Sequence, residues 1–123
     1  MNILIVEPDK ELAKTIKDWL ITDEWNADTA SIAQEALDCL DEEKYDAIVL
    51  ELVIPHSNGV EFLQSVRSYP EWQGIPCIIY TSANIGAMDL PESAKKDLNI
   101  IKVLYKSKNS LADISAEIRE LTA

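Results

Sequence analysis

Polar side chains suited to a phosphoryl or cation site follow four apolar segments of this 123-residue chain. They are three carboxylates, two hydroxyls and one ammonium: Glu7, Asp9, Glu51, Thr81, Ser82 and Lys106. Carboxylate oxygens suit a hard divalent cation, whereas hydroxyls and an ammonium suit the oxygens of a phosphoryl group. The residue types therefore point to metal or phosphate chemistry, provided that the fold brings them together.

Five short apolar runs predict the strands that would position these side chains. They span residues 3–6, 27–30, 47–52, 77–80 and 101–105. Segments with helical spacing separate the runs, and this alternation predicts a parallel sheet. The continuous apolar runs at 47–52 and 77–80 indicate strands covered on both faces, as in a doubly wound α/β fold. In such a sheet, ligand-binding and catalytic residues lie at the carboxyl ends of the strands.

Capping residues indicate where the first helices begin. Asp9 precedes a segment in which Leu12, Ala13, Ile16, Trp19 and Leu20 recur at helical spacing, and it is placed to cap that helix. Residues 31–34 form a capping-box pattern before a second helix. Its buried face is predicted to consist of Ile32, Ala33, Ala36, Leu37 and Leu40. Asn58 is a possible cap for a third helix, with Val60, Leu63 and Val66 facing inward.

The C-terminal part of the chain predicts two more helices. Gly86 and Pro91 limit the first of them to about residues 92–98. The last helix has a clear apolar stripe, made by Leu111, Ile114, Ile118 and Leu121. Among the tryptophans, Trp19 is expected in the core, whereas Trp25 and Trp72 fall near helix ends, where partial exposure leaves them open to partner contact.

Length and composition predict a single domain over residues 1–123, since 47% hydrophobic content suits one compact core. Acidic residues outnumber basic ones by 22 to 11, and the net charge of −11 disfavours direct binding to nucleic acid or to an anionic membrane. Cys39 and Cys77 lie far apart without a metal-type spacing, so both are expected to be buried thiols rather than a disulfide or a zinc site. With no leader-like N-terminal segment, a cytoplasmic location is expected.

Four blocks of the sequence resemble the signature blocks of bacterial response regulator receiver domains. They are ILIVEPD at 3–9, DAIVLELVIPHSNG at 46–59, PCIIYTS at 76–82 and VLYKS at 103–107. The resemblance implies a flavodoxin-like fold, with five helices around a five-stranded parallel sheet in strand order 2-1-3-4-5. It also implies a phosphoryl site, in which an acidic pair holds magnesium and an aspartate accepts the phosphoryl group. A Thr or Ser and a Lys then contact the phosphoryl oxygens.

The match to that site is partial. By position, Glu7 corresponds to the first acid, Thr81 to the switch hydroxyl and Lys106 to the lysine. Pro8 replaces the second acid and offers neither a carboxylate nor an N–H group. Glu51 stands at the phosphoacceptor position with a carboxylate about 1.5 Å further from the backbone. We therefore expect a severely weakened magnesium site at Glu7 and Glu51, no required cofactor and no useful autophosphorylation.

Other positions also depart from the family pattern. Ser107 replaces the proline that usually follows the lysine, and Val103 stands where the family often has its switching aromatic residue, for which Tyr105 is a neighbouring substitute. The segment between Thr81 and Lys106 is a few residues longer than usual. His56, the one histidine of the chain, is expected to be an exposed loop residue rather than a metal ligand or proton relay.

These observations favour a non-enzymatic pseudo-receiver, in which Glu51 pairs with Lys106 and holds one fixed signalling state. Its expected partners are a histidine kinase, another regulator, an output protein or a second copy, bound through the fourth helix, fifth strand and fifth helix. The alternative is a working phosphoacceptor that uses Glu51 and a residual divalent site at Glu7 and Glu51. A small-molecule binder on the same fold is a third possibility, although the chain lacks a Gly-rich phosphate loop after its first strand.

Overall fold

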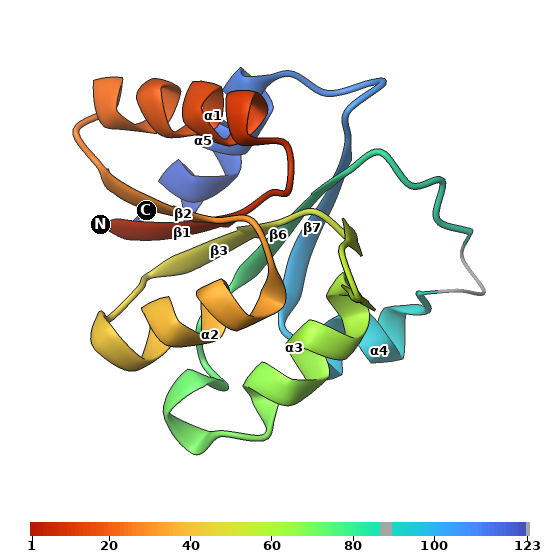
Figure 1. Cartoon of the computed structure of the whole chain (residues 1–123). Helices are drawn as coiled ribbons and strands as arrows, with labels where there is room; N and C mark the ends of the chain where they lie inside the picture. Colours follow the sequence, from red (N-terminus) through yellow and green to blue (C-terminus); the bar gives the residue numbers. More distant parts are fainter. Residues whose placement is uncertain (87–89, 123) are drawn as a thin grey trace.

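A computed structural model describes residues 1–86 and 90–122 of the chain. Within these residues, five strands form one parallel sheet: β1 (Asn2–Val6), β2 (Asn26–Ala30), β3 (Ala47–Leu50), β6 (Cys77–Thr81) and β7 (Ile100–Tyr105). Their order across the sheet is β2-β1-β3-β6-β7. This is the predicted flavodoxin-like order, since β6 and β7 are the fourth and fifth strands of the main sheet (Figure 1).

The third strand is shorter than predicted, because the chain turns into a hairpin after it. β3 ends at Leu50, and β4 (Val53–Ile54) pairs antiparallel with β5 (Ser57–Asn58). The backbone N–H of Glu51 still donates to Val6 O at 2.9 Å. Glu51 is thereby held at the carboxyl edge of the sheet although it lies outside the strand.

Helices cover both faces of the sheet. They are α1 (Lys10–Thr22), α2 (Ala33–Glu42), α3 (Gly59–Arg67), the 3-10 turn η1 (Pro70–Trp72), α4 (Glu92–Asp97) and α5 (Leu111–Glu120). α1 and α5 lie on one face, and α2 and α3 on the other (Figure 1). The short α4 confirms the predicted limits that Gly86 and Pro91 impose on this segment.

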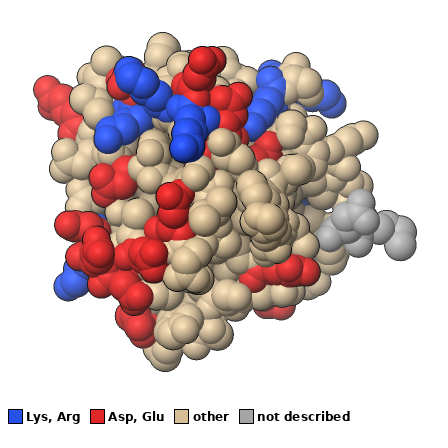
Figure 2. All heavy atoms as spheres, viewed as in Figure 1, with Lys and Arg blue, Asp and Glu red and all other residues tan. Residues whose placement is uncertain are grey.

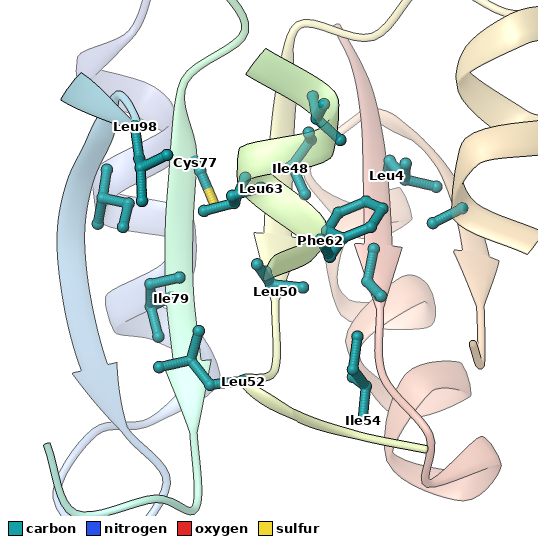
Figure 3. Close-up of a cluster of buried hydrophobic side chains, with 14 of the residues drawn as sticks. Leu4, Ile48, Leu50, Leu52, Ile54, Phe62, Leu63, Cys77, Ile79 and Leu98 are labelled. Atoms are coloured by element: carbon teal, nitrogen blue, oxygen red, sulfur yellow. The ribbon is translucent and has the colours of Figure 1, made fainter. Parts of the chain in front are cut away.

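The core consists of two layers, one on each face of the sheet. Ile3, Ile5, Val49 and Ile78 pack with the α1 and α5 side chains Ile16, Leu20, Ile114 and Ile118. Leu4, Ile48, Leu50 and Ile79 pack on the other face with Phe62 and Leu63 of α3 (Figure 3). Because successive strand residues point to opposite faces, both layers come from the same strands. Cys77 lies in the second layer, whereas Cys39 is only half-buried.

Two of the three predicted helix caps are confirmed. Asp9 accepts hydrogen bonds from the N–H groups of Glu11 and Leu12, and Asn58 accepts one from Glu61. The capping box at 31–34 is wrong, because α2 begins one residue later, with Ile32 at the cap. The hydroxyl and N–H of Ser31 instead donate to the Glu35 carboxylate. This shift also leaves the Ile32 side chain 37% exposed rather than in the core.

Two tryptophans differ from expectation. Trp19 is 42% exposed, because it lies at the margin of α1, where its indole N–H donates to Ser115 Oγ on α5 at 2.7 Å. Trp72 is only 8% exposed, since the η1 turn places its ring in the core beside Tyr69. Trp25 is half-buried, as predicted. The burial of Trp19 and of Trp72 depends on contacts between different segments, and helical spacing alone does not predict such contacts.

Candidate functional site

The predicted site residues meet at the carboxyl edge of the sheet. Glu7 directly follows β1, Glu51 follows β3, Thr81 ends β6 and Lys106 follows β7. Parallel strands bring these ends to one edge, as the sequence predicted. The side chains of Glu7, Glu51 and Thr81 are buried there, with exposed fractions of 4% or less. The structure therefore joins four residues that span a hundred positions of the chain into one polar cluster.

Glu51 is the centre of this cluster, and both of its carboxylate oxygens accept hydrogen bonds. Oε2 accepts from the hydroxyl of Thr81 and from the backbone N–H of Val53, the latter at 3.2 Å. Oε1 accepts from the N–H and the hydroxyl of Ser82 at 3.0 and 2.9 Å, and from Nζ of Lys106 at 2.9 Å. The carboxylate thus links the β4–β5 hairpin to the ends of β6 and β7.

These contacts keep the buried carboxylate ionised. Burial by itself would raise the pKa of Glu51, because it disfavours the charged form. The hydrogen bonds from Thr81, Lys106 and the backbone N–H groups of Ser82 and Val53 outweigh burial and lower the pKa to about 2. Glu51 therefore carries a fixed negative charge at neutral pH.

Lys106 neutralises part of that charge and bridges two acids. Its Nζ lies 2.5 Å from Oε1 of Glu7 and 2.9 Å from Oε1 of Glu51. Burial disfavours the ammonium, but the two carboxylates outweigh this effect and raise the pKa of Lys106. The lysine remains charged and ties the ends of β1, β3 and β7 together.

The magnesium ion of the family's phosphoryl site does not fit this donor set. The carboxylates of Glu7 and Glu51 share the Lys106 ammonium, so a divalent cation would have to displace a cation that is already in place. Pro8 contributes no ligand, and the Asp9 carboxylate is engaged in capping α1. Magnesium is usually held by one or two free carboxylates together with water, and both carboxylates here are already paired with Lys106. Within residues 1–86 and 90–122, no three metal-type side chains converge.

Several contacts of the site were not predicted. Ser82 belongs to the polar set that the sequence singles out, but its two hydrogen bonds to Glu51 depend on the backbone path after β6. The N–H of Val53 reaches Glu51 because Val53 lies in the β4–β5 hairpin, which the apolar pattern does not predict. The Tyr105 hydroxyl donates to Ile85 O at 3.4 Å. His56 lies exposed at the hairpin turn, with a positive φ of 64°.

Comparison with known proteins then assigns the family. The sequence profile of the response regulator receiver domain matches residues 3–114. The chain belongs to this family. It is 36% identical over 81 residues to the response regulator ArlR of Staphylococcus aureus and 32% identical over 81 residues to the probable transcriptional regulator ycf29 of Porphyra purpurea.

Each match covers 66% of this chain but only 36% of ArlR and 39% of ycf29. The chain therefore corresponds to a minor part of the length of these relatives. The activity and partners of those whole proteins do not transfer to it directly.

Solved structures agree on the fold. The Francisella response regulator 1452 receiver domain superposes with a TM-score of 0.83 at 22% identity, covering 98% of this chain and 94% of that one. A two-component response regulator from Clostridium difficile gives 0.85 at 22% identity, with coverage of 99% and 95%. Chemotaxis response regulator CheY4 of Vibrio cholerae gives 0.83 at 18% identity, with coverage of 98% and 97%. At these identities the likeness establishes the architecture alone.

Family membership places the chain among the regulatory domains of two-component signalling, which interact with kinases and other regulators. Among the described helices, none combines the length and the apolar character needed to cross a bilayer.

Proposed function

We propose that this receiver domain signals without being phosphorylated. The observation that carries the proposal is the set of hydrogen bonds that Thr81, Ser82 and Lys106 donate to the Glu51 carboxylate. In the family pattern, the switch hydroxyl and the lysine contact phosphoryl oxygens. Here Thr81 and Lys106 both donate to the Glu51 carboxylate instead, so the cluster is held in one arrangement without a transferred phosphoryl group.

Three features of the site argue against phosphoryl transfer to Glu51. Both carboxylate oxygens are engaged by donors, which withdraws them from attack on a phosphodonor. The additional methylene displaces the carboxylate by about 1.5 Å, a large error for an in-line reaction. The donor set also fails to hold the cation that would neutralise the charge developing in transfer.

The output is then protein contact, and the face formed by α4, β7 and α5 is suited to it. Ile101 of β7 is 39% exposed, and α4 has no buried residue within its span. The partner is a signalling protein: a histidine kinase, another regulator, an output protein or a second copy that forms a homodimer. Acidic side chains are widespread on the face shown in Figure 2, and the net charge of −11 disfavours nucleic acid and anionic membranes as partners. The proposed location is the cytoplasm.

Mass spectrometry after incubation with acetyl phosphate and magnesium tests the proposal. The native chain should remain unmodified. The double substitution Pro8→Asp with Glu51→Asp restores both family residues, so it should gain an acyl phosphate at residue 51. Glu51→Asp alone is the matched control, because it shortens the carboxylate while Pro8 still leaves the metal site incomplete. A hydroxylamine-sensitive acyl phosphate on Glu51 of the native chain would instead establish the working phosphoacceptor.

Partner binding tests the role of the charge. Glu51→Gln keeps the shape of the side chain but removes the charge that holds Lys106 and Thr81. If the fixed arrangement controls signalling, this variant should change the affinity for a partner captured by the native domain. An unchanged affinity would remove the charge of Glu51 from the explanation.

A further inference from the structure

An open hollow of about 520 Å³ borders the candidate site and shares Thr81 and Ser82 with it. It lies between the residues that follow β6 and those that follow β7. Its polar lining consists of Thr81, Ser82, Asn84, Tyr105, Ser107 and Lys108. Glu7, Glu51 and Lys106 do not line it, so the hollow is distinct from the phosphoryl position of the family.

The charge of this hollow is opposite to that of the protein. The chain has 22 acidic and 11 basic residues, yet no carboxylate of residues 1–86 and 90–122 lines the hollow. Lys108 lines it, and this lysine forms no ion pair among the described residues. Hydroxyl groups and a side-chain amide supply the other polar atoms. A cationic group among neutral donors is the environment that a small anion prefers.

The wall that carries the lysine is braced before any ligand arrives. The N–H groups of Lys108 and Asn109 donate to Tyr105 O at 2.9 and 2.7 Å, while Asn109 Oδ1 accepts from Tyr105 N. Nζ of Lys108 lies 5.9 Å from the centroid of the Tyr105 ring. Because this turn is tied internally, it loses little freedom when it binds a ligand.

The opposite wall is fixed by the buried cluster itself. The Thr81 hydroxyl accepts from the N–H of Ala83 at 3.0 Å, and Ser82 donates twice to Glu51. In the described part of the chain, the backbone N–H groups of Asn84, Ile85 and Ser107 have no protein acceptor. The residues that line the hollow therefore offer further donors for an anion.

We infer that this hollow binds a small oxyanion, held by the Lys108 ammonium together with the Ser107 hydroxyl, the Asn84 side-chain amide and N–H donors of both walls. A phosphomonoester and a small carboxylate share this chemistry. Such a ligand would touch Ser82 and Thr81, which contact Glu51 directly, so its binding would reach the buried cluster without covalent change. As an input signal this role rests on the proposed phosphorylation-independent function, whereas the binding itself does not.

An NMR titration of the ¹⁵N-labelled chain tests the inference. Inorganic phosphate and acetate are added separately, with sodium chloride at matched ionic strength as the blank. Saturable amide shifts are expected at residues 81–85 and 105–108. A stronger response to phosphate identifies a phosphomonoester as the ligand class, and a stronger response to acetate identifies a carboxylate.

Two variants make the result specific. Lys108→Ala should weaken the binding by about fivefold to tenfold, because it removes the one charged donor among the described residues that line the hollow. Lys44→Ala removes the same charge beyond the opposite, amino-terminal edge of the sheet and should leave binding unchanged. The absence of saturable shifts, or equal binding by native chain and Lys108→Ala, would overturn the inference. Inorganic phosphate cannot phosphorylate Glu51, so this failure would leave the proposed function untouched.

Discussion

Nζ of Lys106 lies 2.9 Å from Oε1 of Glu51, and this contact joins the residue after β7 to the residue after β3. Both side chains are largely withdrawn from water, so their charges interact more strongly than a surface pair does. Since Glu51 also receives the Thr81 hydroxyl, the pair closes the carboxyl edge of the sheet around one carboxylate.

The first prediction concerns pH. The pKa of Glu51 is about 2 in the folded protein, against an ordinary value of 4.5. Because folding lowers this pKa, the ionised carboxylate stabilises the fold above about pH 4.5, and the contribution is lost as the pH falls toward 2. Linkage makes the loss about 3 kcal/mol. Urea unfolding at neutral pH and between pH 4.5 and 2 should reveal it.

Glu51→Gln should flatten this acid dependence, since the amide does not titrate. Glu120→Gln removes an exposed carboxylate from the end of α5 and serves as the control. If the native chain and Glu51→Gln lost stability in parallel below pH 4.5, the hydrogen bonds to Glu51 would not be the source of the effect.

The second prediction concerns the bridging lysine. Lys106→Met leaves the buried carboxylates of Glu7 and Glu51 without their shared cation, so the free energy of unfolding should fall by about 3–5 kcal/mol. Chemical denaturation measures the change. Lys102→Met is the matched control, because Lys102 is half-exposed and lies 3.9 Å from Glu117; its loss should cost less than about 1 kcal/mol.

Adding Glu51→Gln to Lys106→Met should recover part of the lost stability, because one of the two unpaired charges disappears. Simple additivity of the two substitutions would show that the residues do not interact.

The third prediction concerns a half-buried arginine outside the site. The Arg67 guanidinium donates to three backbone carbonyls, those of Trp72, Ile75 and Leu98, at 2.5, 2.6 and 2.8 Å. Arg67→Met would leave these carbonyls without their donor and should lower the unfolding free energy by about 2–4 kcal/mol. Arg119→Met, which removes an exposed arginine paired with Asp23, should cost less than about 1 kcal/mol in the same thermal or urea experiment. Equal losses would assign Arg67 no special structural role.

The fourth prediction concerns the glycine that begins α3. A Cβ at Gly59 would lie 2.7 Å from Leu52 Cδ2 and 2.8 Å from Leu52 Cα, so the backbone after Glu51 would have to move. Gly59→Ala should therefore destabilise the fold by about 1–3 kcal/mol and shift the amide resonances of Val53 and Ser82. Gly74→Ala meets no atom within 4 Å and should be neutral in stability. If Gly59→Ala left the free energy of unfolding unchanged, the hairpin backbone could move to accept a Cβ without destabilising the fold.

The sequence by itself determined which residues could meet. Parallel strands expose their carboxyl ends at one edge, so the order of apolar runs was enough to bring Glu51, Thr81 and Lys106 together. Local patterns also determined the caps at Asp9 and Asn58, because an N-cap bond spans only two or three residues.

Apart from the predicted pairing of Glu51 with Lys106, only the tertiary structure decided which of these groups bond to one another. The bridge from Lys106 to Glu7 and the two hydrogen bonds from Ser82 depend on differences of about an ångström in backbone position, which residue type and spacing do not carry. The same is true of Trp19 and Trp72, whose burial depends on segments distant in the chain, and of Arg67, whose partners are carbonyls that no side-chain pattern marks. Periodicity describes one element at a time, whereas burial and hydrogen bonding are properties of several elements in contact.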